Sequence, residues 1–157
     1  MSDRVETVLE SRAPEDTERL GAALAPALAA GDVLVLSGPL GSGKTRFVAG
    51  LARGLHVRGR VRSPSFGLIH EYPGATRLVH ADLYRVSEGE ADLLGLEELR
   101  ERGPLVVEWG EKLPARLRDD ALELRFAIVS DQVRSISAAA SGERGRELLA
   151  RWRRAAR

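Results

Sequence analysis

A glycine-rich segment between an apolar run and a helical pattern constrains this chain more than any other feature. Val33-Leu34-Val35-Leu36 is a continuous apolar run, which is typical of a strand buried on both faces of a mainly parallel sheet. The segment Gly38-Pro39-Leu40-Gly41-Ser42-Gly43-Lys44-Thr45 follows it, and apolar residues at helical spacing continue to Gly54. A glycine, four residues and then Gly-Lys-Thr, between a strand and a helix, is the signature of a phosphate-binding loop.

The residue types in this loop match the chemistry of binding a nucleotide phosphate. Gly41 and Gly43 allow backbone N–H groups to approach a phosphate closely, in dihedral angles that other residues disfavour. The Lys44 ammonium can reach the β- and γ-phosphates, the Thr45 hydroxyl can bind Mg2+, and the following helix directs its positive N-terminus at the anion. A chance match in a glycine-rich turn is the alternative, but the flanking strand and helix favour nucleotide binding. We therefore expect ATP and Mg2+ as cofactors, with every residue of the loop at the nucleotide.

Two acidic residues are candidates to complete a magnesium-nucleotide site. Glu108 ends a second buried apolar run, where its carboxylate can meet the metal directly or through water. Asp82 can hold metal-bound water or orient the attacking water. The alternatives are a solvated glutamate at a strand end and a surface salt bridge from Asp82 to Arg85. Given the loop, we favour Glu108 as a metal ligand together with Thr45, and Asp82 as a catalytic residue together with Lys44.

A proline-containing segment follows the loop helix. In Val61-Arg62-Ser63-Pro64-Ser65-Phe66 the proline rules out a continuous helix, and two hydroxyl groups flank it. Such a segment suits a mobile loop that senses the γ-phosphate, whereas an ordinary Ser-Pro turn before a strand is the alternative.

The remaining patterns predict an α/β fold. Strands are expected at residues 5–9, 66–71, 76–83, 105–107, 122–126 and 133–136, and helices at 14–31, 45–54, 88–102 and from 143 onward. Pro26 indicates a kink or an early end of the first helix, and Pro73-Gly74 marks a hairpin turn. The expected architecture is a P-loop NTPase-like three-layer sandwich, with a mostly parallel central sheet and added antiparallel strands. Without an internal repeat or a linker, residues 1–157 are expected to form a single domain.

Composition narrows the function by what it excludes. The chain has no cysteine, which excludes disulfides and cysteine-ligated zinc, and its three histidines are too far apart for a metal motif, so oxygen atoms must hold any metal. A net charge of +1 gives no bulk attraction to nucleic acid and leaves RNA contact undecided. No apolar run approaches the roughly 18 residues of a membrane span, and Met1-Ser2-Asp3-Arg4 does not resemble the start of a signal peptide. We expect a cytoplasmic protein.

Four segments together resemble the TsaE family, the ATPase component of bacterial tRNA threonylcarbamoyladenosine biosynthesis. The four segments are the loop extended to Arg46-Phe47, then Arg62-Ser63-Pro64-Ser65-Phe66, His80-Ala81-Asp82-Leu83-Tyr84-Arg85 and Val107-Glu108-Trp109. Their order, spacing and the total length agree with the family. The loop is common to a superfamily, whereas the last two segments are specific to this family.

The resemblance implies roles for individual residues. It implies that Lys44 contacts the phosphates and that Thr45 and Glu108 bind magnesium. It implies that hydrolysis requires Asp82 and that the Ser-Pro-Ser segment is a switch. Ser65 and Trp109 are added to the residues that contact the nucleotide. The departures are mild. Ser65 replaces the family's usual threonine but keeps the hydroxyl, Ser42 and Arg46 replace common alanine and threonine, and Gly110 stands where proline follows Glu-Trp in the family.

The resemblance also implies partners. The family's modification lies on the adenosine next to the anticodon, and its transfer belongs to TsaD and TsaB, which a TsaE protein binds and is thought to reset by ATP hydrolysis. We expect these two proteins as partners, tRNA contact to be indirect, and hydrolysis by the isolated chain to be slow.

Other functions remain open on the sequence alone. A GTPase is disfavoured because the usual guanine motif needs an asparagine and this chain has none. A small-molecule kinase using Asp82 as a base, and a module in which nucleotide only stabilises a docking shape, are the remaining alternatives. For adenine, segments 11–16 and 130–134 are candidates without a chosen residue. The basic C-terminal helix either contacts RNA or is solvated with Trp152 packed inward, and the second is favoured.

Overall fold

The computed structural model describes residues 5–61 and 68–157. Its strands are β1 (Val5–Ser11), β2 (Val33–Ser37), β3 (Ile69–Tyr72), β4 (Leu78–Asp82), β5 (Leu105–Glu108), β6 (Leu122–Ile128) and β7 (Arg134–Ala140). Its helices are α1 (Pro14–Leu24), α2 (Lys44–Gly54), α3 (Glu88–Ala91), α4 (Leu96–Leu99), α5 (Ala115–Arg118) and α6 (Glu143–Ala155), with short 3₁₀ helices at Ala25–Ala27 and Gly110–Lys112.

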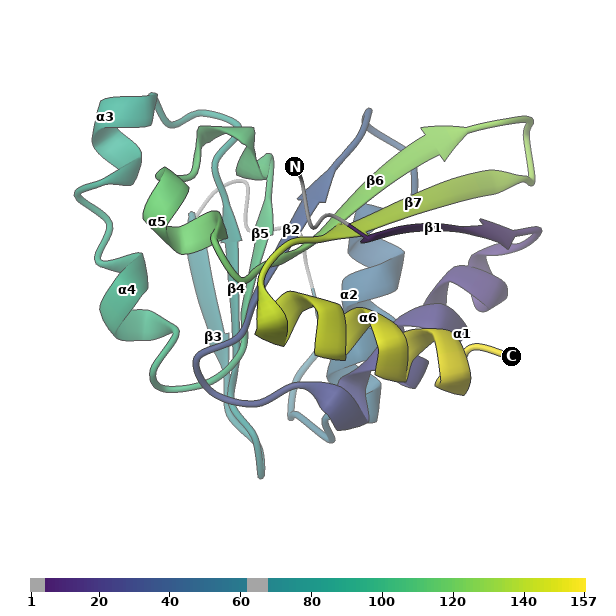
Figure 1. The fold of residues 1–157 in the computed structure, drawn as a ribbon, viewed down its shortest axis with the longest axis horizontal. Helices are drawn as coiled ribbons and strands as arrows, with labels where there is room; N and C mark the ends of the chain where they lie inside the picture. Colours follow the sequence, from purple (N-terminus) through teal and green to yellow (C-terminus); the bar gives the residue numbers. More distant parts are fainter. Residues whose placement is uncertain (1–4, 62–67) are drawn as a thin grey trace.

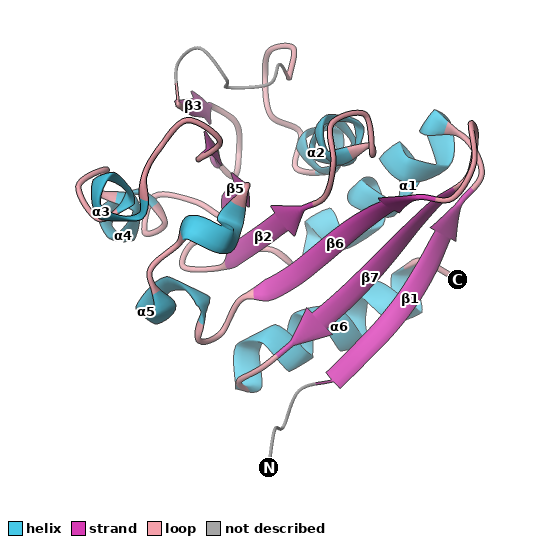
Figure 2. Cartoon of the chain, turned by 90° about the horizontal axis from the view of Figure 1, so that it is seen from above, coloured by secondary structure: helices cyan, strands magenta, loops and turns pink. Residues whose placement is uncertain are grey.

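All seven described strands form one sheet in the order β1-β7-β6-β2-β5-β4-β3. The four central strands, β6, β2, β5 and β4, run parallel to one another. The outer pairs β1–β7, β6–β7 and β3–β4 are antiparallel. Figure 2 shows how β6, β7 and β1 extend the sheet beyond β2. A mostly parallel centre with added antiparallel strands is confirmed.

Helices cover the two faces of the sheet and create two separate cores. On β2, Leu34 and Leu36 pack into the core beneath α1, α2 and α6, whereas Val33 and Val35 pack into the core beneath the α3–α5 region. This alternation follows the period of two along a strand. In Figure 1 the two helical groups lie on different sides of the sheet, which confirms the three-layer arrangement.

Two predicted helices end earlier than expected. Helix α1 stops at Leu24 and a 3₁₀ turn contains Pro26, so the early end that the proline indicated is confirmed. The single helix predicted over 88–102 is wrong, because two four-residue helices occupy that region. Gly95 lies between them with φ 70°, a left-handed conformation that ends a right-handed helix.

Helix α6 is held against the fold along its length. Trp152 is fully buried, its indole Nε1 donates to the Leu20 carbonyl at 2.8 Å, and its ring contacts Phe47 edge-on at 5.9 Å between centroids. The inward-facing alternative for this tryptophan is therefore confirmed, and the side chain is not available to stack on a base. None of the helices in the described parts of the chain is long and apolar enough to cross a membrane.

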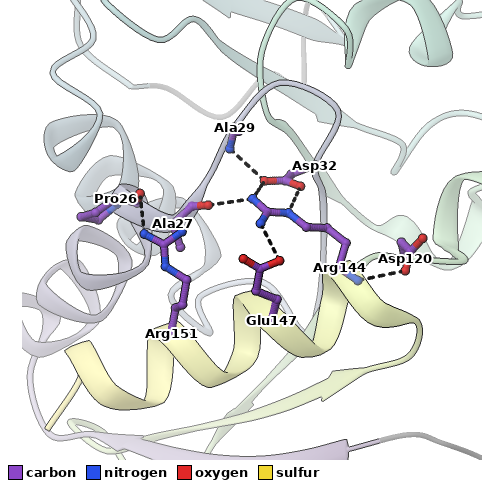
Figure 3. Close-up of polar contacts among 8 residues, drawn as sticks. All are labelled: Pro26, Ala27, Ala29, Asp32, Asp120, Arg144, Glu147 and Arg151. Atoms are coloured by element: carbon purple, nitrogen blue, oxygen red, sulfur yellow. Dashed lines mark hydrogen bonds and ion pairs between the residues drawn. The ribbon is translucent and has the colours of Figure 1, made fainter.

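At the other end of α6, an arginine joins the helix to the start of β2 (Figure 3). Arg144 donates from Nε and Nη2 to the two carboxylate oxygens of Asp32, each at 2.7 Å, and also from Nη2 to the Ala27 carbonyl at 2.9 Å. Asp32 in turn accepts from the Ala29 N–H at 2.8 Å and is 5% exposed. This buried charge is thus fully hydrogen-bonded, as a stable interior ion pair requires.

Candidate nucleotide site

The glycine-rich loop has backbone angles that explain its glycines. Gly38 has φ 137°, and a Cβ there would lie 2.5 Å from the Phe126 carbonyl oxygen of the neighbouring strand. Gly43, at φ 105°, immediately precedes the first residue of α2, so the loop leads directly into the helix N-terminus. The helix therefore begins where its free N–H groups face the loop, which is the arrangement that binds anions.

Three parallel strands end together at this loop. Leu36 of β2 is the register partner of Glu108 on β5, and Glu108 is the partner of Asp82 on β4. The carboxyl ends of these strands and the loop enclose a cavity of about 250 Å³. Among the predicted site residues, its lining includes Pro39, Leu40, Gly41, Ser42, Gly43, Lys44, Thr45, Asp82, Glu108 and Trp109, but not Gly38. Arg46 and Tyr84, which were not predicted as site residues, also line it. The sheet topology thus brings together residues up to 70 positions apart, from Pro39 to Trp109.

Lys44 is turned back onto its own loop. Its ammonium donates to the carbonyl oxygens of Gly38 and Pro39, the latter at 3.2 Å, and lies 4.7 Å from the centre of the Trp109 ring. Burial lowers the pKa of Lys44, and the nearby carboxylates of Glu108 and Asp82 act in the opposite direction. Among the described residues, the direct contacts of this buried cation are carbonyl groups and an aromatic face, so it is well placed to exchange them for phosphate oxygens.

Asp82 is a buried carboxyl group and not a surface residue. It is 5% exposed, and its Oδ1 accepts a hydrogen bond from the Tyr84 N–H at 2.9 Å. Burial raises its pKa, the Tyr84 hydrogen bond lowers it, and the charge of Glu108 raises it further. The solvated surface role considered for Asp82 is therefore inconsistent with its position, because this carboxyl is removed from solvent.

Glu108 is also buried, at 3% exposed, and has a partner that the sequence reasoning did not single out as a site residue. His80 Nε2 lies 2.6 Å from Glu108 Oε2, and His80 is fully buried. His80 lies two residues before Asp82 on β4, so both side chains point to the same face of the sheet. Because side chains alternate between the two faces of a strand, the position of His80 two residues before Asp82 could have indicated that His80 lies beside the site.

Trp109 continues the wall of the cavity in an unusual conformation. It has φ 60°, a left-handed value that is uncommon for a residue with a side chain, and its ring contacts Tyr84 at 4.9 Å between centroids. The turn that follows is crowded, because a Cβ on Gly110 would lie 2.1 Å from Val35 Cγ1. The glycine at this position lets the chain pass against β2 and aim Trp109 at the loop.

A second cavity, of about 170 Å³, lies against another part of the same loop. Gly41, Gly43 and Arg46 line it together with Ala13, Pro14, Thr17, Asp131, Gln132 and Arg134. Arg134 Nη2 also donates to the Gly41 carbonyl at 3.3 Å. The structure therefore brings the two candidate adenine segments, 11–16 and 130–134, to one place beside the phosphate loop.

One predicted site residue cannot be placed. Ser65 lies outside the described residues, as does the whole Ser-Pro-Ser segment at residues 63–65. Leu68, the first residue described after this segment, accepts a hydrogen bond from the Asp82 N–H at 2.8 Å.

Fold and loop define a protein with a P-loop NTPase-like α/β fold. The family model described as "Threonylcarbamoyl adenosine biosynthesis protein TsaE" matches residues 11–136. This chain belongs to the TsaE family, whose members take part in tRNA threonylcarbamoyladenosine biosynthesis, and the resemblance seen in its four motif segments is confirmed.

Similar proteins support the assignment over most of the chain. Proteins named "tRNA threonylcarbamoyladenosine biosynthesis protein TsaE" include one from Mycobacterium tuberculosis, 42% identical over 74% of this chain and 76% of its own length. Another, from Streptomyces coelicolor, is 42% identical over 80% of this chain and 90% of its own length. The solved structure described as "Crystal structure of Bacillus subtilus YdiB" superposes with a TM-score of 0.82 at 32% identity, covering 98% of this chain and 97% of that one.

Proposed function

We propose that this protein binds ATP with Mg2+ in the cavity beside Lys44, hydrolyses it slowly, and uses hydrolysis to reset the TsaD–TsaB transferase between turnovers. The observation that carries the proposal is the meeting of Lys44 with two buried carboxyl groups, Asp82 and Glu108, at the ends of adjacent strands. Phosphate-loop hydrolysis needs these parts: a cation for the phosphates, an acid for the metal and an acid for the water.

The loop offers unused donors to a phosphate. The Ser42 hydroxyl is buried and has no hydrogen-bond partner among the described residues. An unpaired buried hydroxyl is costly unless a ligand satisfies it. Together with the N–H groups at the start of α2, it fits a phosphate chain lying along residues 38–45, to which Lys44 adds its charge.

Thr45 and Glu108 are the residues that would hold Mg2+, whose bound form neutralises charge on the phosphate oxygens. No group of three or more histidine, aspartate or glutamate side chains in the described ranges is arranged to hold a metal by itself. Two protein oxygens suit magnesium, which keeps several waters and commonly shares its coordination with substrate phosphates.

Asp82 is placed to orient the water that attacks the γ-phosphorus. The water oxygen forms the new P–O bond, the bond from the γ-phosphorus to the bridging oxygen breaks, and ADP leaves with that electron pair. The water proton passes toward Asp82 or a phosphate oxygen. A buried carboxyl whose pKa is raised is a better acceptor of that proton than an exposed aspartate.

The second cavity is the candidate place for the adenosine. It adjoins Gly41 and Gly43, so a nucleoside there is continuous with phosphates on the loop. Arg134, already bonded to the Gly41 carbonyl, offers a cationic plane on which a base can stack. Replacing Gln132, an exposed residue that lines this cavity, by a bulky residue should weaken the binding of adenosine nucleotides and leave the binding of inorganic triphosphate unchanged.

The Ser63–Phe66 segment is proposed as the switch, with Ser65 near the γ-phosphate. Support comes from Leu68, which follows this segment by two residues in the sequence and accepts a hydrogen bond from the Asp82 N–H of β4. Ordering of such a segment by ATP, and its release after hydrolysis, would present and withdraw a surface for TsaD and TsaB.

The test is threonylcarbamoyl transfer to tRNA by purified TsaD and TsaB, with ATP and threonylcarbamoyl-adenylate, comparing the wild-type chain, Lys44→Ala and no addition. Arg53→Ala is the matched control, because Arg53 is a surface cation on the same helix paired with Glu18. Multiple turnovers in the reactions with wild type and with Arg53→Ala, and in neither of the other two reactions, support the proposal. Equal single turnovers in all reactions would contradict it, and transfer of phosphate to an added alcohol would indicate a kinase.

A further inference from the structure

We propose that His80 is a positioning residue that fixes the Glu108 carboxylate for the metal. The inference rests on the proposed function, since it concerns the same magnesium site. Glu108 has three rotatable side-chain bonds and lies beside the cation of Lys44, so its carboxylate can turn in more than one direction. The His80 ring, fully buried on the adjacent strand, removes that freedom.

The contact between the two residues is short and shielded from water. His80 Nε2 lies 2.6 Å from Glu108 Oε2, with side chains 0% and 4% exposed. A carboxylate that binds a metal is in its ionised form and only accepts hydrogen bonds, so His80 donates from Nε2 in the metal-binding arrangement. The bond engages one carboxylate oxygen of Glu108 and leaves Oε1 for the metal or its water. Such outer contacts commonly determine the orientation of a metal-binding side chain.

The other ring nitrogen supports this hydrogen-bond direction. His80 Nδ1 is buried and has no hydrogen-bond partner among the described residues. A buried N–H without a partner is costlier than a bare acceptor nitrogen, so the hydrogen bond to Glu108 is best made by a proton on Nε2. That proton is the one directed at Glu108, and His80 therefore acts as a fixed donor.

Covalent geometry gives a matched pair of variants. The amide nitrogen of glutamine is as many bonds from Cα as the Nε2 of histidine, whereas the amide nitrogen of asparagine matches Nδ1. His80→Gln keeps a donor at the carboxylate, and His80→Asn withdraws it toward the strand. His80→Leu introduces an apolar side chain of similar bulk and removes the donor altogether.

The experiment measures Mn2+ affinity of the protein bound to a non-hydrolysable ATP analogue, by electron paramagnetic resonance, and analogue affinity in EDTA. Metal affinity should fall by about 10- to 100-fold in His80→Leu and His80→Asn, the usual loss when such a contact is removed, and should be largely retained in His80→Gln. Analogue affinity without metal should stay the same in every variant.

Two results would overturn the inference: Mn2+ affinity in His80→Leu equal to wild type, or equal losses in the glutamine and asparagine variants. The first would reduce His80 to a packing residue, and the second would show that the donor position is irrelevant. Neither affects the proposed function. That proposal fails separately, if the wild-type protein with analogue binds no Mn2+ beyond what the free analogue binds.

Discussion

Asp82 and Glu108 are register partners on the adjacent parallel strands β4 and β5, so two buried carboxyl groups lie side by side at one end of the sheet. Burial is the largest cause of the raised pKa of Asp82, and the charge of Glu108 raises it further. The protein without ligand therefore carries an electrostatic cost that a bound cation would relieve. A substitution that removes the charge of Asp82 should therefore affect the stability of the protein and its catalytic activity in opposite directions.

We predict that Asp82→Asn stabilises the metal-free, nucleotide-free protein at neutral pH while abolishing hydrolysis. Asparagine mimics the protonated acid and can still accept the Tyr84 N–H bond. Since the folded-state pKa is raised above the unfolded value, the folded protein binds more protons than the unfolded chain, and stability falls as pH rises through this interval. The gain should be present above the raised pKa and vanish at acid pH. Thermal unfolding in EDTA across pH measures it, and a loss of stability at neutral pH would contradict the prediction.

Nucleotide binding should change the fluorescence of Trp109. In the free protein the Lys44 ammonium lies 4.7 Å from its ring, and phosphates should draw the ammonium away. Trp152, a residue of α6, is fully buried and should report no change. Titration with ATP should shift the emission of the wild type and leave that of Trp109→Phe unaltered. An equal shift in both proteins would place the change at Trp152 instead.

Gly110→Ala should destabilise the protein by about 1 to 3 kcal/mol, the usual cost of forcing an extra methyl group into a packed interior. The added Cβ would lie 2.1 Å from Val35 Cγ1, so β2 or the turn after Trp109 must move. Val35→Ala removes the clashing methyl group, and the double variant should recover part of the loss beyond additivity. Urea unfolding of the wild type, the two single variants and the double variant measures this coupling. Strictly additive changes in the free energy of unfolding would contradict the prediction.

Arg144→Met should destabilise the fold by roughly 3 kcal/mol, the low end for breaking a buried ion pair. The substitution leaves the 5% exposed Asp32 without its two guanidinium bonds, while Arg144 itself is 31% exposed. Adding Asp32→Asn removes the uncompensated charge and should restore part of the stability. Glu147→Gln, which alters only the exposed 3.2 Å contact to the same arginine, should cost less than about 0.5 kcal/mol. Equal effects of Arg144→Met and Glu147→Gln in urea unfolding would contradict this.

Local sequence patterns predicted the elements that carry the site. The buried runs of β2 and β5, the loop between β2 and α2, and the alternation of β6 and β7 all appear near their expected positions. These features depend on short-range periodicity and on glycine conformations, which a single sequence displays. Asp82 and Glu108 could be proposed because acids at the ends of such strands have few alternative positions.

Long-range geometry could not be predicted in the same way. The contact of His80 with Glu108 depends on which strands become neighbours, and β4 pairs with β5 although α3 and α4 separate them in sequence. The interruption at Gly95 was missed because the flanking residues keep helical spacing across it. The parallel pairing of β6 with β2, which places Phe126 against Gly38, also has no local signal.

The sheet order bears on how the chain matures during synthesis. Strand β1 precedes the other described strands in the sequence, yet it lies at the sheet edge and its only partner in the described sheet is β7, the last of them. Strand β2, which leads into the loop, likewise lacks one of its two neighbours until β6 has been made. During synthesis β1 therefore lacks its sheet partner until β7, which begins at Arg134, has left the ribosome.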